Sequence, residues 1–479
     1  MDAGNTLSTA KSVRLFPKTR TFQETIGGRD RQDFFRFNVR AQSNINARIN
    51  GAGSLTLLTQ DGTAIGQSGD DRIRQTLAPG TYWIRVSSTT RQESEYRLRM
   101  NAAWLQSNVL MIVADDFGID TSPLYNTGSR KPNMPTLRSL AGNGIVYDNA
   151  WVYPVCTPTR ASIFMGKHGF RTNVGGVDDL LSPQEPNIFR AVSNASTPYS
   201  TAVVGKWHVS GSNPDPNTPS QFGVQYYSGF LSGGGVEDYS NWNGVEQGRR
   251  FNSRTYATTE FTSKAINWID RQQQPWFLSL TYNAPHTPFH KPPNNLISRR
   301  SRQLSGTEQD IRQNPQPYYF AAAEAMDAEI GRLLKSMPSQ TRNNTVVMFI
   351  GDNGTPRRVV QSPFGFDSAK GTVKEGGVRV PLIVSGAGVT RRNQREDALV
   401  TGSDLFATIS DITGAGATTG VDSLSLRDSF TNPAFAGRNF AYTEFFTDRV
   451  RGGGRRGGGG NDDDGVSGPT NLWTIRDRQ

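Results

Sequence analysis

The stretch Asn-Val-Leu-Met-Ile-Val-Ala-Asp-Asp (108–116) decides the fold of this 479-residue chain. Residues 108–114 form a nearly continuous apolar run, which is typical of a strand buried on both faces of a sheet. Similar runs recur farther along the chain, at 201–204, 276–280, 345–350 and 382–384. Helical patterns lie between them, and the clearest covers 318–337. Strands that alternate with helices predict an α/β domain with a large, mostly parallel sheet flanked by helices.

The first hundred residues follow a different pattern and predict a separate domain over 1–102. Short alternating runs at 34–39, 54–58, 82–86 and 96–99 are separated by turn signals, which predicts a small all-β sandwich. The segments "DFFRF", "SLTLLTQDGTAI" and "LAPGTYWIRV" resemble the bacterial pre-peptidase C-terminal domain. That resemblance implies an accessory module that binds a surface or a polysaccharide.

The α/β domain is expected over 105–440, and residues 441–479 are expected to form an incomplete C-terminal subdomain. Within the latter, 451–468 is rich in Gly and Arg and ends in an acidic run, so we expect a flexible surface loop. Because the acidic half of this tract offsets its basic half, we expect no nucleic-acid partner.

The composition sets bounds on the class of protein. Hydrophobic residues make up 35% of the chain, enough for a sizeable core, and no stretch approaches the roughly 20 apolar residues of a membrane span. The net charge of +10 is compatible with an ordinary basic protein or with an anionic substrate or polymer as partner. No secretory signal follows Met1, although a sandwich of this type favours export to the periplasm or beyond.

Polar residues gather where the predicted strands end. Asp115 and Asp116 end the first core run, and further candidates follow the later strands: Lys206 and His208, His286, and Asp352 with Asn353. In open α/β sheets the ligand site lies outside the carboxyl ends of the strands. Oxygen donors such as Asp115, Asp116, Asp352 and Asn353 suit Ca²⁺ or Mg²⁺ better than zinc.

The only cysteine, Cys156, begins the segment Cys-Thr-Pro-Thr-Arg (156–160). A lone cysteine is most often an inert packing residue. Here Thr157 and Pro158 predict a helix over 159–165 that ends at Gly166, which places Cys156 just before a helix N-terminus, a position that favours an anion. The cations Arg160, Lys206 and Lys370 would stabilise a tetrahedral oxyanion, and His208 and His286 can exchange protons near neutral pH. This combination indicates group transfer from a tetrahedral anionic ester.

Six segments between about 108 and 404 then match one family in order: "NVLMIVADD", "CTPTRASIFMG", "GKWH", "APHTPFH", "FIGDNG" and "KGTVKEGGVRVP". The chain resembles the formylglycine-dependent sulfatases of the alkaline-phosphatase-like superfamily. The resemblance implies that a formylglycine-generating enzyme oxidises Cys156 to formylglycine, an aldehyde that hydrates to a geminal diol.

The resemblance also implies a role for each site residue. Asp115, Asp116, Asp352 and Asn353 would hold one Ca²⁺, with Mg²⁺ as an alternative. One diol hydroxyl would attack sulfur, and His286 with Lys370 would assist departure of the alcohol. His208, beside Lys206, would deprotonate the second hydroxyl, and Arg160 would hold the diol and the metal carboxylates. Lys374 stays an alternative to Lys370, because the register of this loop is open.

The expected function is hydrolysis of sulfate esters of a carbohydrate or aryl alcohol, with an anionic polysaccharide among the candidate substrates. Two alternatives stay open at this point. One is a phosphonate monoester or phosphodiester hydrolase of the same superfamily, which uses similar groups. The other is a truncated, inactive relative that binds an anionic glycan.

Overall fold

The computed structural model describes residues 3–15, 19–39, 42–67, 71–233, 236–416, 422–447 and 471–477. The chain divides into two compact units. The first comprises Met1–Asn108 with Trp268–Trp276 and Met337–Asn344, and the second comprises Val109–Asn267, Phe277–Ser336 and Thr345–Gln479. The loop expected at 451–468 lies outside the described residues. No described helix is long and apolar enough to cross a membrane.

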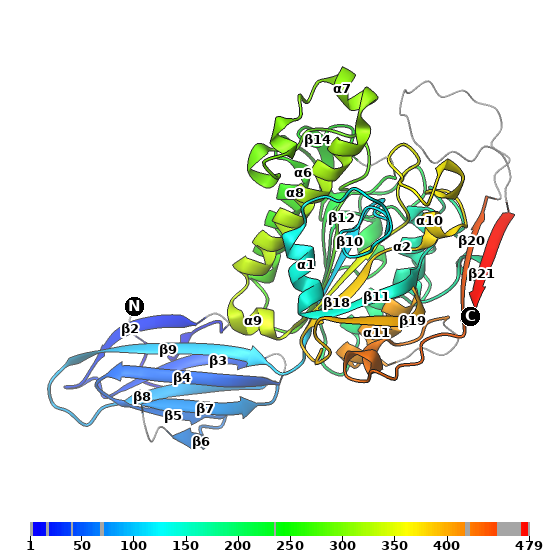
Figure 1. Ribbon diagram of the computed structural model, residues 1–479. Helices are drawn as coiled ribbons and strands as arrows, with labels where there is room; N and C mark the ends of the chain where they lie inside the picture. The colour runs from blue at the N-terminus through cyan, green and yellow to red at the C-terminus, as the bar shows by residue number, and fades with distance from the viewer. Residues whose placement is uncertain are drawn as a thin grey trace. The chain divides into compact units, whose positions relative to one another are not determined.

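The first unit contains two β-sheets that enclose a common core (Figure 1). One sheet has the order β1 (Lys11–Ser12), β3 (Gln32–Val39), β8 (Gly80–Ser87), β5 (Ser54–Leu58), β6 (Ala64–Gln67). The other has the order β2 (Arg20–Ile26), β9 (Ser94–Trp104), β4 (Ser43–Gly51), β7 (Arg72–Leu77). Alternate residues such as Phe35 and Ile84 from one sheet and Ile45 and Leu98 from the other fill the space between them. The predicted alternating runs lie in β3, β5, β8 and β9, so this segment is an all-β sandwich.

The second unit is built on a ten-stranded sheet. Its order is β15 (Arg249–Ser253), β14 (Trp242–Glu246), β13 (Tyr226–Phe230), β12 (Ser200–Lys206), β16 (Trp276–Thr281), β10 (Asn108–Ala114), β17 (Thr345–Gly351), β18 (Leu382–Gly386), β11 (Gly144–Trp151), β19 (Gln394–Thr401). The predicted α/β class is confirmed. The sheet is mixed, because parallel pairs such as β10–β16 and β12–β13 are flanked by antiparallel pairs such as β13–β14 and β17–β18.

The hairpin β14–β15 at the edge of the ten-stranded sheet accounts for one of its antiparallel strand pairs. Its two turn residues, Gln247 and Gly248, have φ of 49° and 79°. Positive φ at both central residues is the requirement of a two-residue type I′ turn, which matches the twist of the flanking strands. Strands joined this tightly can only run antiparallel.

Helices cover the sheet. One layer consists of α2 (Cys156–Met165), α4 (Ile188–Ser193) and α11 (Asp404–Thr413), whose apolar residues share one core cluster with Val109, Met111 and Val113 of β10. Elsewhere α1 (Pro135–Gly142) packs against α8 (Pro315–Ser336), and α6 (Ala257–Ile269) is tied to α8 by a hydrogen bond from Thr259 to Glu329. Shorter helices are α3 (Gly169–Thr172), α5 (Thr218–Gln221), α7 (Glu308–Gln313), α9 (Ser339–Asn343) and α10 (Glu375–Val378).

Helix α2 begins three residues earlier than the sequence predicts, so Cys156 is its first residue rather than the residue before it. The predicted hydroxyl cap is wrong, because the N-cap is Val155 and makes no side-chain cap hydrogen bond. The two threonine hydroxyls are engaged elsewhere: Thr159 Oγ1 accepts from the Tyr153 N–H, and Thr157 Oγ1 lies 3.0 Å from His208 Nε2. The predicted end at Gly166 is confirmed, with φ of 63°.

Near the C-terminus, β20 (Phe440–Phe446) pairs antiparallel with β21 (Asn471–Asp477). Within β20, Thr443, Glu444 and Phe445 are buried, whereas Trp473 and Ile475 of β21 are exposed.

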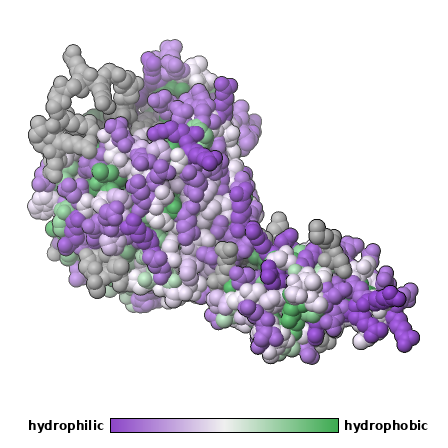
Figure 2. All heavy atoms as spheres, turned by 180° about the vertical axis from the view of Figure 1, so that it is seen from behind, coloured by the Kyte–Doolittle hydropathy of each residue, from purple (hydrophilic) through white to green (hydrophobic). Residues whose placement is uncertain are grey.

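On the face shown in Figure 2 the surface is largely hydrophilic, with apolar side chains in small scattered groups.

Candidate active site

The strand ends, helix α2 and the loop before α10 bring all ten predicted site residues of the second unit into one buried region. Asp115 and Asp116 follow β10, Lys206 ends β12, His286 follows β16, and Asp352 and Asn353 follow β17. None of the ten is more than 5% exposed: Asp115, Asp116, Cys156, Arg160, Lys206, His208, His286, Asp352, Asn353 and Lys370. Charged side chains are rarely buried unless they are paired with other polar or charged groups. The contacts of these residues therefore determine which of them can bind a metal ion or transfer a proton.

Cys156 lies beside residues at the ends of β10, β12 and β17. Its Sγ is 3.6 Å from Lys206 Nζ, and the ligand atoms of Cys156, Asp115 and Asp352 all lie within 4.8 Å of one another. Burial raises the pKa of the thiol to about 12, although the charge of Lys206 opposes this. Burial therefore favours the neutral thiol of an unmodified Cys156 at neutral pH.

Two cations hold the neighbouring carboxylates. Arg160 donates from Nε and Nη2 to Asp352 Oδ2 at 3.1 and 2.8 Å, and from Nη1 to the Lys206 carbonyl oxygen at 2.8 Å. Lys206 Nζ donates to Asp115 Oδ2 at 2.6 Å. Burial disfavours the charged form of Lys206, but the carboxylate of Asp115 raises its pKa, so the ammonium group stays charged.

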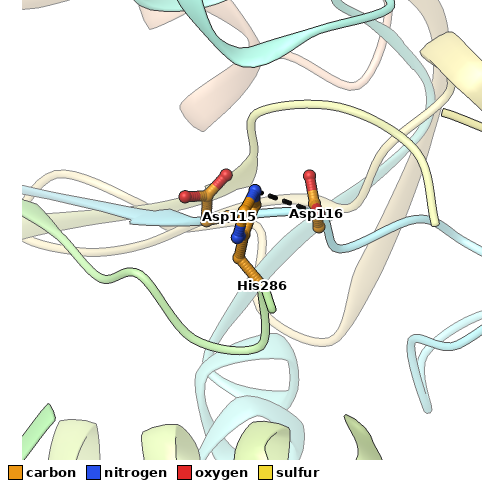
Figure 3. A group of neighbouring side chains, drawn as sticks. All are labelled: Asp115, Asp116 and His286. Carbon is orange, nitrogen blue, oxygen red and sulfur yellow. Dashed lines mark ion pairs between the residues drawn. The ribbon is translucent and has the colours of Figure 1, made fainter. Parts of the chain in front are cut away.

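Asp116 interacts with Lys370 and His286, and Figure 3 shows Asp116 and His286 beside Asp115. Lys370 Nζ lies 3.0 Å from Asp116 Oδ1, and His286 Nε2 lies 3.7 Å from Asp116 Oδ2. The other ring nitrogen of His286 donates to the Thr287 carbonyl oxygen at 2.9 Å, which leaves Nε2 facing the site. Lys374 is exposed at the start of α10, so the structure places Lys370 in the cluster and leaves Lys374 out of it.

His208 is held by Thr157 and by Asp178, a residue that the sequence analysis did not single out. Its Nε2 lies 3.0 Å from Asp178 Oδ1 and 3.0 Å from Thr157 Oγ1, whereas Nδ1 is buried and has no hydrogen-bond partner among the described residues. Burial, helped by the charge of Lys206, lowers the pKa of His208 to about 4, so the ring is neutral at neutral pH. Asp178 lies between α3 and α4 and follows none of the core strands, so the pattern of polar residues at strand ends does not predict it.

The donor set fits a divalent cation. Asp115 Oδ1 and Asn353 Oδ1 are buried and lack a hydrogen-bond partner among the described residues, although a buried oxygen normally has one. Asn353 Nδ2 donates to Asp116 Oδ1 at 2.7 Å, and the Asp116 backbone N–H donates to Asp352 Oδ1 at 3.0 Å, so Asp116 holds both the Asn353 and the Asp352 side chains. Carboxylate and amide oxygens are the ligands that Ca²⁺ and Mg²⁺ prefer.

The remaining histidines lie outside this cluster. His168 Nδ1 is 3.2 Å from the Tyr153 hydroxyl. His290 stacks on Tyr239 with ring centroids 4.0 Å apart, and Tyr239 donates from its hydroxyl to the His286 carbonyl oxygen at 2.8 Å. His290 thus supports the segment that carries His286.

The Sulfatase family model matches residues 107–415, which include all ten site residues. Among curated proteins, an uncharacterized sulfatase of Escherichia coli, YdeN, is 24% identical over 365 residues, covering 64% of this chain and 62% of that protein. Pig N-acetylgalactosamine-6-sulfatase is 26% identical over 350 residues, covering 64% and 62%. The ulvan-active sulfatase of Formosa agariphila is 26% identical over 359 residues, covering 68% and 65%. The chain thus spans about three fifths of the length of the first two relatives.

Solved structures show the same fold. Ps i-CgsB in complex with k-i-k-neocarrahexaose has a TM-score of 0.59 at 23% identity, with 71% of this chain and 80% of that chain covered. The phosphonate monoester hydrolase SpPMH from Silicibacter pomeroyi has a TM-score of 0.54 at 21% identity, with 71% and 80% covered. Because the family model matches more than half of the sequence and spans the whole buried cluster, this chain belongs to the sulfatase family.

Proposed function

We propose that this protein is a sulfuric ester hydrolase that cleaves sulfate esters of a carbohydrate or an aryl alcohol. The observation that carries the proposal is the position of Cys156, within 3.6 Å of Lys206 Nζ and beside Asp115 and Asp352 at the carboxyl ends of the core strands. A tetrahedral anionic group placed there would meet Lys206, Lys370 and Arg160, whose positive charges suit the charge that develops in the transition state.

The nucleophile is formylglycine, made from Cys156 by a formylglycine-generating enzyme. Its hydrated form supplies one hydroxyl that attacks sulfur and a second that allows sulfate to leave afterwards. The residues suited to hold Ca²⁺ are Asp115, Asp116, Asp352 and Asn353, and Mg²⁺ is the alternative. When bound, the ion lowers the pKa of a nearby hydroxyl and polarises the ester oxygens.

The protein's own residues supply the proton transfers. In its doubly protonated form His286 also carries a proton on Nε2, beside Lys370 and Asp116, from where it can protonate the departing alcohol. His208 is neutral, and its Nε2 is engaged by Asp178, so its unpaired Nδ1 can accept a proton from the second hydroxyl. Because the cluster is buried, these transfers take place with little competing water.

The nucleophile is tested on the tryptic peptide Ser139–Arg160, which contains Cys156. Protein made together with a formylglycine-generating enzyme should yield this peptide with an aldehyde in place of the thiol, as mass spectrometry would show. That protein should hydrolyse 4-nitrophenyl sulfate, and Cys156→Ala should lower kcat at least about 10³-fold. An intact thiol, under conditions that convert a control sulfatase, would overturn the proposal.

The metal site is tested by thermal unfolding, independently of turnover. Ca²⁺ at about 100 times its Kd should stabilise the fold by about 2.7 kcal/mol and raise Tm. Asp352→Asn should remove most of this shift, whereas Glu308→Gln, at an exposed position of α7, should retain it. Equal shifts in both variants would argue against this donor set.

The same cluster could act on a phosphonate monoester or a phosphodiester, since these substrates also present a tetrahedral anionic centre. The two activities are separated by the rates of one preparation on 4-nitrophenyl sulfate and on a 4-nitrophenyl phosphonate ester. A higher kcat/KM on the sulfate supports the proposal, and a higher kcat/KM on the phosphonate contradicts it.

A further inference from the structure

A cavity of about 870 Å³ lies beside the edge hairpin of the large sheet, where Figure 1 labels β14. Its walls come from the segment after His208 and from β13, β14 and β15. The side chains that matter here are those of Asn213, Leu231, Asn243, Val245, Arg250 and Asn252. None of them is used by the reaction proposed above.

The strand register explains the chemistry of this cavity. Asn243 pairs with Asn252 and Val245 pairs with Arg250, so these four side chains lie on one face of the hairpin. Phe251 belongs to the opposite face, where it packs edge-to-face on Trp242. Val245 and Leu231 are buried in the main core cluster, whereas Asn243, Arg250 and Asn252 are exposed. The cavity therefore has an apolar floor and a polar rim, which suits a sugar ring with its apolar C–H face and polar edges.

Arg250 adds a positive charge to the rim. Among the described residues, its guanidinium forms neither an ion pair nor a hydrogen bond. Glu246, the acidic residue of this hairpin, is paired with Lys264 at 2.7 Å and accepts from the Tyr226 hydroxyl at 2.6 Å. An unneutralised guanidinium presents a planar set of donors that matches a carboxylate or a sulfate group.

The cavity shares a wall with the active site. The Trp207 and His208 N–H groups donate to the carbonyl oxygens of Phe230 and Leu231, at 3.0 and 3.1 Å. Gly233 packs so closely on His208 that a Cβ at this glycine would lie 2.0 Å from Nε2. The segment 230–233 therefore contacts His208 through Leu231 and Gly233, while Phe230, Leu231 and Ser232 line the cavity.

We infer that this cavity is a binding subsite for a sugar ring that carries a carboxylate or sulfate group and is linked to the ring whose sulfate is cleaved. The inference rests on the proposed function and names its substrate class as an anionic oligosaccharide or polysaccharide. Arg250 binds the anionic group, Asn243 and Asn252 bind ring hydroxyls, and Leu231 and Val245 contact the apolar face.

The test compares Arg250→Ala with Arg249→Ala, a matched control on the same strand. Arg249 lies opposite Glu246 in the register and on the other face of the hairpin. Binding is measured by calorimetry on the 479-residue chain with Cys156→Ala, using chondroitin 6-sulfate, ulvan and ι-carrageenan oligosaccharides and their desulfated forms. At least one sulfated probe should bind, and Arg250→Ala should weaken it about tenfold or more, with little change in Arg249→Ala. In the active background, kcat/KM for 4-nitrophenyl sulfate should be the same in both arginine variants.

The outcomes separate this inference from the proposed function. If no probe binds, or if both arginine variants weaken binding equally, the subsite is overturned even when aryl sulfate is hydrolysed. If a probe binds through Arg250 but the modified protein hydrolyses no sulfate ester, the subsite stands as a glycan site and the proposed function fails.

Discussion

At the scale of single residues, two non-glycine residues in the left-handed backbone region meet in the active site. His208 has φ of 53° and Asp178 has φ of 61°, and their side chains lie 3.0 Å apart. Such conformations cost about 1–3 kcal/mol each and persist where the surrounding structure enforces them, often at functional sites. The contact with Gly233 and the hydrogen bond to Asp178 together fix the ring of His208.

We expect Asp178→Asn to lower kcat about 10- to 100-fold with little change in KM, because the carboxylate selects the His208 tautomer that leaves Nδ1 free. Since His208 is already neutral at neutral pH, raising the pH should not restore the rate. Steady-state kinetics on 4-nitrophenyl sulfate from pH 5 to 9 check this, with the exposed Glu237→Gln as control. An unchanged kcat would show that Asp178 does not position the base.

At the scale of elements, α2 carries Cys156 and Arg160 into the active site. All ten residues of this helix are buried, so the surrounding core holds it in position. A helix buried on every side depends on close packing at its ends as well as along its length. Gly166 ends α2 with φ of 63°, and a Cβ there would lie 2.7 Å from the ring of Phe406 on α11. Gly414 ends α11 with φ of 69° and has nothing within 4 Å of its Cβ position.

These two glycines form a matched pair. Gly414→Ala should cost about 1–2 kcal/mol from backbone strain alone. Gly166→Ala should cost about 1–3 kcal/mol more, because the added methyl group must displace Phe406. Urea unfolding gives both values, and equal losses of stability would contradict the packing role assigned to Gly166.

At the scale of the whole molecule, buried titratable groups make stability depend on pH. Burial lowers the pKa of His290 to about 4, and its ring accepts from the Tyr256 hydroxyl at 2.9 Å, which requires the neutral form. An unfolded histidine titrates near 6.5, so between about pH 6.5 and 4 the unfolded state binds more protons. The contribution of His290 is therefore complete above about pH 6.5 and is lost as the pH falls toward 4.

Asp327 acts in the opposite direction, since burial raises its pKa to about 6 and its contribution grows as the pH falls through that value. We therefore isolate the histidine by difference, comparing the wild type with His290→Gln. The free-energy difference in unfolding between them should shrink by about 1–3 kcal/mol from pH 7 to pH 5. A difference that stays constant over this range would contradict the assignment of a neutral, buried His290.

Much of this architecture could be predicted from local sequence. The apolar run at 108–114 and its four counterparts form the core strands β10, β12, β16, β17 and β18, because short continuous apolar runs are typical of strands buried on both faces of a sheet. The polar residues that follow them met in one place, because the strand ends of an α/β sheet lie at a common edge. The antiparallel edges were not predicted, since the direction of a neighbouring strand depends on how the connection closes.

The α/β class, the sandwich and the ionisable residues at the strand ends can be predicted from the local sequence pattern. The start of α2 at Cys156, the contact of Lys370 rather than Lys374 with Asp116, and the support of His208 by Asp178 depend on the folded structure. The burial that keeps the Cys156 thiol neutral also depends on it. The physical reason is that strand periodicity is a local property of the chain, whereas desolvation, ion pairing and backbone strain depend on residues that are distant in sequence and meet only in the folded protein.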